Sequence, residues 1–131
     1  MTSGILIVDD LLNWRRTLSQ VLAGRGYYVE AVTNSEEAKQ ALASGRFKLI
    51  VIDVRLVDSD DSNVEGLELL EEIDAEGLDI KAIVMTGFET AHTEKRALQC
   101  SRCVAFIKKD EFDIHRFLEA VEAVISPSIT A

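Results

Sequence analysis

The chain has 131 residues, 47% of them hydrophobic and 28% charged, a composition that fits one globular domain with a single core. Its formal net charge of −9 argues against direct binding to nucleic acid, which needs a basic surface. No apolar run approaches the roughly 18 residues that a membrane span requires, and the first residues lack a leader pattern, so a cytoplasmic protein is expected.

Short apolar runs alternate with amphipathic stretches, which predicts βα units on a parallel sheet. In chain order we predict a strand over 4–9, a helix over about 12–24, a strand over 27–33, a helix that Ser35 caps and Gly45 ends, a strand over 47–53, a helix over about 65–75, a strand over 80–85, a helix over about 90–99, a strand over 104–108 and a last helix that carries Phe112 to Val124. We take 1–125 as one domain and 126–131 as a tail or the start of a linker.

Right-handed crossovers and helices on both faces favour a doubly wound, flavodoxin-like (βα)5 fold, with the five parallel strands in the order 2-1-3-4-5. In this order the first and third strands are neighbours. Each of these strands ends in aspartate: Asp9, followed by Asp10, ends the first, and Asp53 ends the third. The three acids should therefore share one edge of the sheet.

Such a cluster of acids needs a physical reason. Close carboxylates repel each other by up to about 4 kcal/mol per pair at an effective dielectric constant near 20. A hard divalent cation such as Mg²⁺, which prefers oxygen ligands, would relieve this repulsion. The fourth strand ends in Thr86 and the fifth in Lys108 and Lys109, which brings a hydroxyl and an ammonium to the same edge. Acids, hydroxyl and ammonium together indicate phosphoryl transfer to a carboxylate.

With these residues in place, the chain resembles the receiver domain of bacterial two-component response regulators over residues 4–125. The resemblance implies that Asp53 is the phosphoacceptor. It implies that Asp10 binds Mg²⁺ (or Mn²⁺) directly and Asp9 through water, with Asp53 and the backbone carbonyl of Arg55 completing the metal shell. Thr86 would be the switch hydroxyl.

The resemblance also assigns an aromatic residue and a lysine on the fifth strand. Phe106 corresponds to the aromatic side chain whose rotamer follows the switch hydroxyl. Side chains alternate along a strand, so only one of Lys108 and Lys109 can enter the site. Aligning Phe106 with the family pattern places the functional lysine at Lys109.

Three features depart from the family pattern. Asp110 follows the lysine where the family usually has proline. The loop after Asp53 is long and acidic, since Gly66 comes thirteen residues after the acceptor. Arg55 and Phe88 each lie two residues beyond a site residue and are expected to restrict water and lengthen the life of the acyl phosphate.

The resemblance implies a signalling domain rather than a turnover enzyme. A histidine kinase or a histidine phosphotransfer protein would phosphorylate Asp53, and the face formed by the helix over 90–99, the strand over 104–108 and the last helix would change its partner or form a homodimer. The output domain or partner is not predicted. The alternative is a pseudo-receiver that binds partners without phosphorylation. A haloacid dehalogenase-type phosphatase is disfavoured, because it needs an acid where Arg55 stands.

Overall fold

The computed structural model describes residues 4–56, 63–87 and 91–125. Its elements follow the predicted alternation: β1 (Gly4–Val8), α1 (Leu12–Ala23), β2 (Tyr28–Val32), α2 (Ser35–Leu42), β3 (Phe47–Asp53), α3 (Glu65–Glu76), β4 (Lys81–Thr86), α4 (Ala91–Leu98), β5 (Cys103–Lys108), the 3₁₀ turn η1 (Lys109–Glu111) and α5 (Ile114–Glu122). The strands are all parallel, in the order β2-β1-β3-β4-β5. The predicted flavodoxin-like fold is confirmed.

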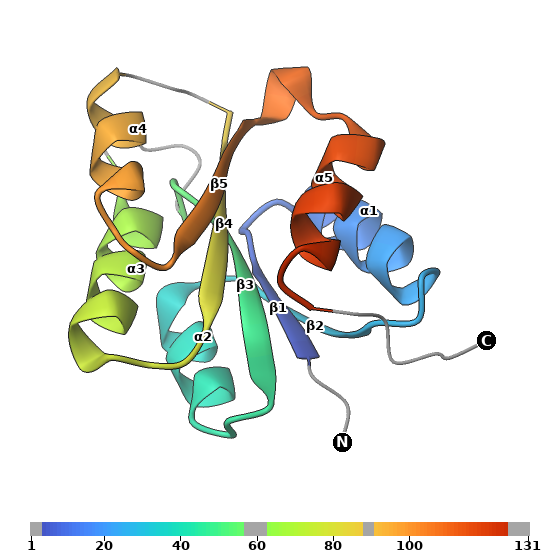
Figure 1. Ribbon diagram of the computed structural model, residues 1–131, viewed down its shortest axis with the longest axis horizontal. Coiled ribbons are helices and arrows are strands. Elements are labelled where there is room, and N and C mark those ends of the chain that lie inside the picture. The colour runs from blue at the N-terminus through green and yellow to red at the C-terminus, as the bar shows by residue number, and fades with distance from the viewer. Residues whose placement is uncertain (1–3, 57–62, 88–90, 126–131) are drawn as a thin grey trace.

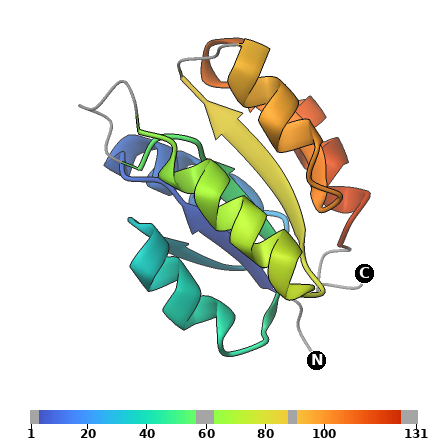
Figure 2. The ribbon, with the colours of Figure 1, turned by 90° about the vertical axis from the view of Figure 1, so that its left-hand side faces the viewer.

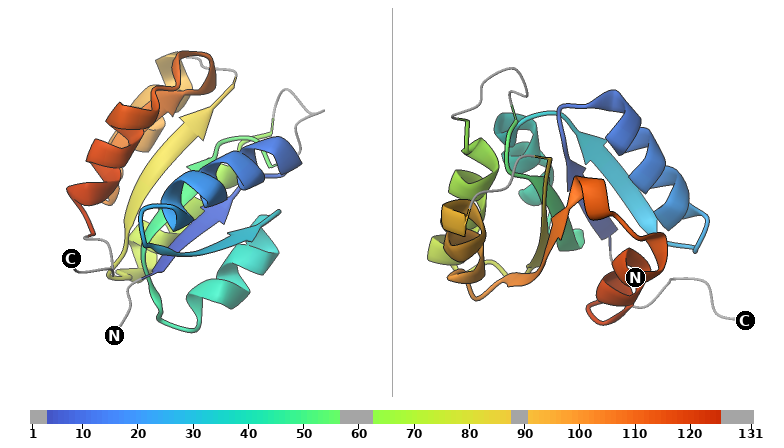
Figure 3. Two further views of the ribbon diagram at one scale, coloured as in Figure 1. Left: turned by 90° about the vertical axis from the view of Figure 1, so that its right-hand side faces the viewer. Right: turned by 90° about the horizontal axis from the view of Figure 1, so that it is seen from above.

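Helices cover both faces of the sheet (Figure 1). Figure 2 shows the face covered by α2, α3 and α4, and the left view of Figure 3 shows the face covered by α1 and α5. Alternate residues of β1 divide between the two cores: Leu6 and Val8 pack on the α2–α3–α4 side, and Ile5 and Ile7 pack on the α1–α5 side. This is why the central strands are continuous apolar runs.

The cap of α2 lies one residue earlier than predicted. Asn34, not Ser35, is the N-cap, and its Oδ1 accepts a hydrogen bond from the Glu37 backbone N–H at 2.8 Å. The Glu37 carboxylate reaches back to the backbone N–H of Thr33 at 2.8 Å. Both Asn and Ser can cap, but Asn34 has the extended backbone (φ −149°, ψ 172°) that capping requires.

The last helix also begins later than predicted. The turn η1 follows β5, and Asp113 caps α5 by accepting from the backbone N–H groups of His115 and Arg116 at 2.9 and 3.1 Å. Phe112 therefore lies outside the helix, between η1 and the cap, and its ring packs against Phe117 of α5. The apolar spacing that placed Phe112 in the helix reflects burial of its ring, not helical backbone.

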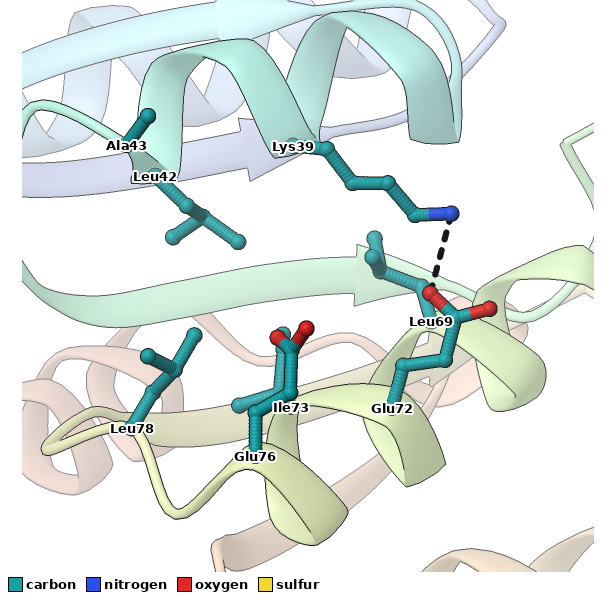
Figure 4. Close-up of a pocket in the computed structure, with 8 residues that line it drawn as sticks. All are labelled: Lys39, Leu42, Ala43, Leu69, Glu72, Ile73, Glu76 and Leu78. Atoms are coloured by element: carbon teal, nitrogen blue, oxygen red, sulfur yellow. Dashed lines mark ion pairs between the residues drawn. The ribbon is translucent and has the colours of Figure 1, made fainter.

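A groove runs between α2 and α3 (Figure 4). The Lys39 ammonium from α2 forms an ion pair with the Glu72 carboxylate from α3 at 2.9 Å across it. The groove is lined by Lys39, Leu42, Ala43, Leu69, Glu72, Ile73, Glu76 and Leu78. It contains none of the acids at the strand ends.

The remaining expectations on chain organisation concern membrane spans and the C-terminal end. Among residues 4–56, 63–87 and 91–125, no helix is long and apolar enough to cross a bilayer. The predicted tail, residues 126–131, lies outside the described residues. The domain boundary at residue 125 therefore stays a prediction.

Candidate functional site

The structure brings Asp9, Asp10 and Asp53 together at the edge of the sheet. One carboxylate oxygen from each lies within 4.8 Å of the others. The register explains this proximity, because Val8 pairs with Ile52 and the next residues are Asp9 and Asp53. Asp9 and Asp53 are 2% and 3% exposed, so two of the three acids are buried. The predicted acidic cluster is confirmed as a spatial arrangement.

Asp9 is held by backbone hydrogen bonds on both sides. Its Oδ1 accepts from the Leu11 N–H at 2.9 Å, and its own N–H donates to the Val32 carbonyl at 3.1 Å. The Arg15 guanidinium donates to the Asp9 carbonyl at 2.9 Å from the first turns of α1. Arg15 was not predicted as a site residue. It acts on the backbone of Asp9, which no spacing of acidic residues indicates.

Lys109 is the lysine that enters the site. Its Nζ lies 2.8 Å from Asp9 Oδ2 and 3.4 Å from Asp53 Oδ2, and its side chain is 7% exposed. Lys108 instead points outward, with Nζ 3.6 Å from Glu111 Oε2 and 41% of its side chain exposed. The two adjacent lysines thus point to different sides, Lys108 at the end of β5 and Lys109 at the start of η1, and the role of Lys109 stays a prediction.

Burial dominates the electrostatics of the two buried acids. Desolvation and then the neighbouring Asp9 charge raise the pKa of Asp53 to about 7, against the opposing effect of the Lys109 ammonium. Desolvation also raises the pKa of Asp9, even though Lys109 forms a close ion pair with it. One ammonium therefore compensates the buried carboxylates only in part.

The donor set fits a hard divalent cation. When all three acids are ionised, three carboxylates and one ammonium leave a formal charge of −2, which one divalent ion balances. The converging atoms are all carboxylate oxygens, the ligand type that Mg²⁺ and Mn²⁺ accept, and the cluster contains neither thiol nor imidazole. The described residues thus support the predicted class of metal.

Thr86 and Phe106 lie on the two strands beside the acidic cluster. Asp53 pairs with Met85 on β4, so Thr86 follows one position further along the same edge and is 2% exposed. Phe106 on β5 is half-buried and packs against the core on the α2–α3–α4 side. Thr86 therefore lies at the end of β4 next to the level of Asp53, Phe106 lies on β5, and the switching role of both stays a prediction.

The structure describes some of the residues that depart from the family pattern. Arg55, two residues after Asp53, is 8% exposed, and its effect on the access of water to Asp53 stays a prediction. Phe88 and residues 57–62 of the acidic loop lie outside the described residues. Asn63 joins the two ends of that loop, because its Oδ1 accepts from the N–H of Leu56 at 3.0 Å and of Glu65 at 3.1 Å.

Gly66 directly contacts the end of β3 at Asp53, which its spacing alone did not reveal. A Cβ at this position would lie 1.9 Å from the Asp53 carbonyl oxygen. The Gly66 N–H also donates to the Val54 carbonyl at 3.0 Å, which holds the first turn of α3 against the end of β3. Only a glycine allows this approach of two backbones.

We expect Gly66→Ala to destabilise the domain by about 3 kcal/mol, because the new methyl group forces α3 away from Asp53. Helix propensity alone would predict the opposite sign, by roughly 1 kcal/mol in favour of alanine. Urea denaturation measures the difference. Gly87→Ala is the matched control, since among the described residues a Cβ there meets only Lys109 Cδ, at 3.9 Å. An unchanged stability in Gly66→Ala would contradict the close approach.

Comparison with known proteins agrees with this geometry. The family model described as "Response regulator receiver domain" matches residues 5–122. A CheY-like response regulator receiver domain protein from Methanospirillum hungatei JF-1 has a similar structure, with 28% identity, a TM-score of 0.81, and coverage of 94% of this chain and 93% of that one. A response regulator protein from Burkholderia pseudomallei, with a phosphorylated aspartic acid, calcium ion and citrate, is 25% identical, with a TM-score of 0.76 and coverage of 90% and 65%.

Curated relatives give the same family. The transcriptional regulatory protein ZraR of Escherichia coli (strain K12) is 30% identical over 109 residues, which cover 83% of this chain and 24% of the relative. The chain thus spans about a quarter of the length of such relatives. Because the family match extends from β1 to the last turn of α5, the chain belongs to the response regulator receiver domain family of two-component systems.

Proposed function

We propose that Asp53 accepts a phosphoryl group from a histidine kinase or a histidine phosphotransfer protein. The observation that carries this proposal is the cluster of Asp9, Asp10 and Asp53, two of them buried, with the Lys109 ammonium in contact with those two. The phosphorylated aspartic acid in the related Burkholderia pseudomallei protein supports a carboxylate acceptor in this fold.

In the transfer, a carboxylate oxygen of Asp53 attacks phosphorus, an O–P bond forms, and the P–N bond of the donor phosphohistidine breaks. Asp9, Asp10 and the backbone carbonyl of Arg55 would hold Mg²⁺ or Mn²⁺ beside Asp53. The bound cation would neutralise charge on the phosphoryl oxygens. Lys109 would donate a hydrogen bond to a second phosphoryl oxygen, and Thr86 to a third.

The signal would leave through the face formed by α4, β5 and α5. Each of these elements exposes one large apolar side chain: Leu98 is 55% exposed, Val104 44% and Ile114 41%. Rearrangement of Thr86 and Phe106 would alter this face and its affinity for a partner or a second copy of the chain. The domain would then be a phosphorylation-dependent switch and not a turnover enzyme.

The test is phosphorylation by a small donor. Wild-type protein with Mg²⁺ and acetyl phosphate should gain one phosphoryl group by intact mass, and beryllofluoride should change Trp14 fluorescence. Asp53→Asn should lose both responses, whereas Asp79→Asn, at a side chain that is 95% exposed, should keep them. A response that survives in Asp53→Asn would show that the acceptor is another residue. No response in the wild type would favour the pseudo-receiver.

The same assay measures the proposed roles of Arg55 and Phe88. After removal of the donor, the acyl phosphate should decay faster in Arg55→Ala and Phe88→Ala than in the wild type, because water reaches the phosphoryl group more easily. Equal decay rates would contradict a shielding role.

A further inference from the structure

Trp14 is the residue near the site that the proposed function leaves unused. Its indole ring lies under the Lys109 ammonium, with Nζ 5.0 Å from the ring centroid. This distance is typical of a cation–π contact, and the nearly complete burial of the Lys109 side chain favours a strong one. We propose that Trp14 is a positioning residue that holds Lys109 at the phosphoacceptor site, an inference that rests on the proposed function.

The Lys109 ammonium needs a third contact, because its two carboxylate partners have other ligands to bind during phosphorylation. Lys109 is held by the carboxylates of Asp9 and Asp53 at 2.8 and 3.4 Å. The cation and the incoming phosphoryl group would use these same carboxylates. The indole of Trp14 is the contact that neither would take. It therefore keeps the ammonium beside the acceptor when its carboxylate partners are engaged.

The indole is itself fixed in orientation. Phe112 meets it edge-on, with ring centroids 5.4 Å apart and an interplanar angle of 82°. Phe112 in turn packs against Phe117, a fully buried residue of α5, at 5.4 Å. Such aromatic pairs contribute beyond the area they bury. Trp14 is thus packed, through Phe112, against Phe117 of α5. Its ring cannot move away from the lysine without disrupting this packing.

Trp14 contacts both ends of the short turn η1. Lys109 begins the turn, and Phe112 follows it, with its N–H donating to the Lys109 carbonyl at 3.3 Å. The Trp14 ring thus contacts the Lys109 ammonium at the start of η1 and the Phe112 ring just after its end. A tryptophan that merely filled the core would require only the Phe112 contact. The Lys109 contact is what assigns Trp14 a role in positioning the lysine.

The experiment separates the π-face from the packing. Trp14→Phe keeps an aromatic face, and Trp14→Leu keeps apolar packing without one. The rate of phosphorylation by acetyl phosphate should fall in the order Trp, Phe, Leu, with the Leu variant about 3- to 10-fold slower, as expected for a cation–π contact of usual strength. In a Lys109→Met background, Trp14→Leu should have no further effect. An equal loss in that background would show a structural role and overturn the proposal.

A spectroscopic readout does not depend on phosphorylation. The δ and ε protons of Lys109, assigned by their absence in Lys109→Met, should be shifted upfield by the indole ring current in wild-type protein, with and without Mg²⁺. The shift should disappear in Trp14→Leu. Identical Lys109 resonances in the two proteins, or loss of the shift on adding Mg²⁺, would overturn the proposal. A retained shift in a wild type that takes no phosphoryl group would refute the proposed function and leave the Trp14–Lys109 contact supported.

Discussion

Replacing Lys109 by methionine should lower the free energy of unfolding by about 3 kcal/mol at pH 8 in the absence of divalent cations. The substitution keeps most of the apolar volume but leaves the buried carboxylates of Asp9 and Asp53 without their shared ammonium. Removing one partner from a buried ion pair usually costs about 3 to 5 kcal/mol. The lower end is expected here because Asp53, with its raised pKa, can take up a proton. Urea denaturation with EDTA measures the loss.

Lys108→Met provides the matched control, because the two lysines are adjacent and differ in environment. The Lys108 side chain is 41% exposed and its partner Glu111 is 68% exposed, so its loss should cost no more than about 0.5 kcal/mol. Added Mg²⁺ should stabilise Lys109→Met more than the wild type, since the ammonium no longer competes for the carboxylates. Equal losses in the two variants would mean that Lys109 does not compensate the acids.

Asp53→Asn should stabilise the metal-free protein at pH 8 by about 2 to 4 kcal/mol. Folding raises the pKa of Asp53 from its ordinary value of 3.8 to about 7, because the carboxylate loses water and faces Asp9. Each pKa unit corresponds to about 1.4 kcal/mol of free energy. Coupling to Asp9 and Lys109 makes the net cost of burying the Asp53 charge smaller than the change in pKa alone would give. The amide keeps the shape of the side chain and removes the charge that burial disfavours. The Asp53 carboxylate is thus held in the fold at a cost in stability.

The sign of the pH dependence follows from proton binding. Between pH 3.8 and about 7 the folded state holds a proton on Asp53 that the unfolded state has lost, so this group stabilises the fold at low pH and ceases to do so as pH rises through 7. The advantage of Asp53→Asn should therefore be small near pH 4 and grow up to pH 8. Asp79→Asn, at an exposed carboxylate, should show no such growth. A constant difference across this range would contradict a raised pKa at Asp53.

The fold and the acidic cluster were predictable because both follow from one-dimensional patterns. Apolar runs buried on two faces must be central parallel strands, and residues that follow neighbouring strands must meet at one edge. Asp9 follows β1 and Asp53 ends β3, so no detail of packing was needed to bring them together. The exact ends of the helices were harder to predict. Asn34 caps α2 instead of Ser35 because of the backbone conformation at this one residue.

The order of the strands and the set of acids, hydroxyl and lysine at their ends follow from the sequence alone. The contacts that support these groups depend on tertiary packing: Gly66 lies against the Asp53 carbonyl, Arg15 binds the Asp9 carbonyl, and Trp14 lies under the Lys109 ammonium. The physical reason is that hydrophobic periodicity and strand ends depend on near neighbours in the chain. These supporting contacts join distant segments, and their geometry exists only after the helices have packed on the sheet.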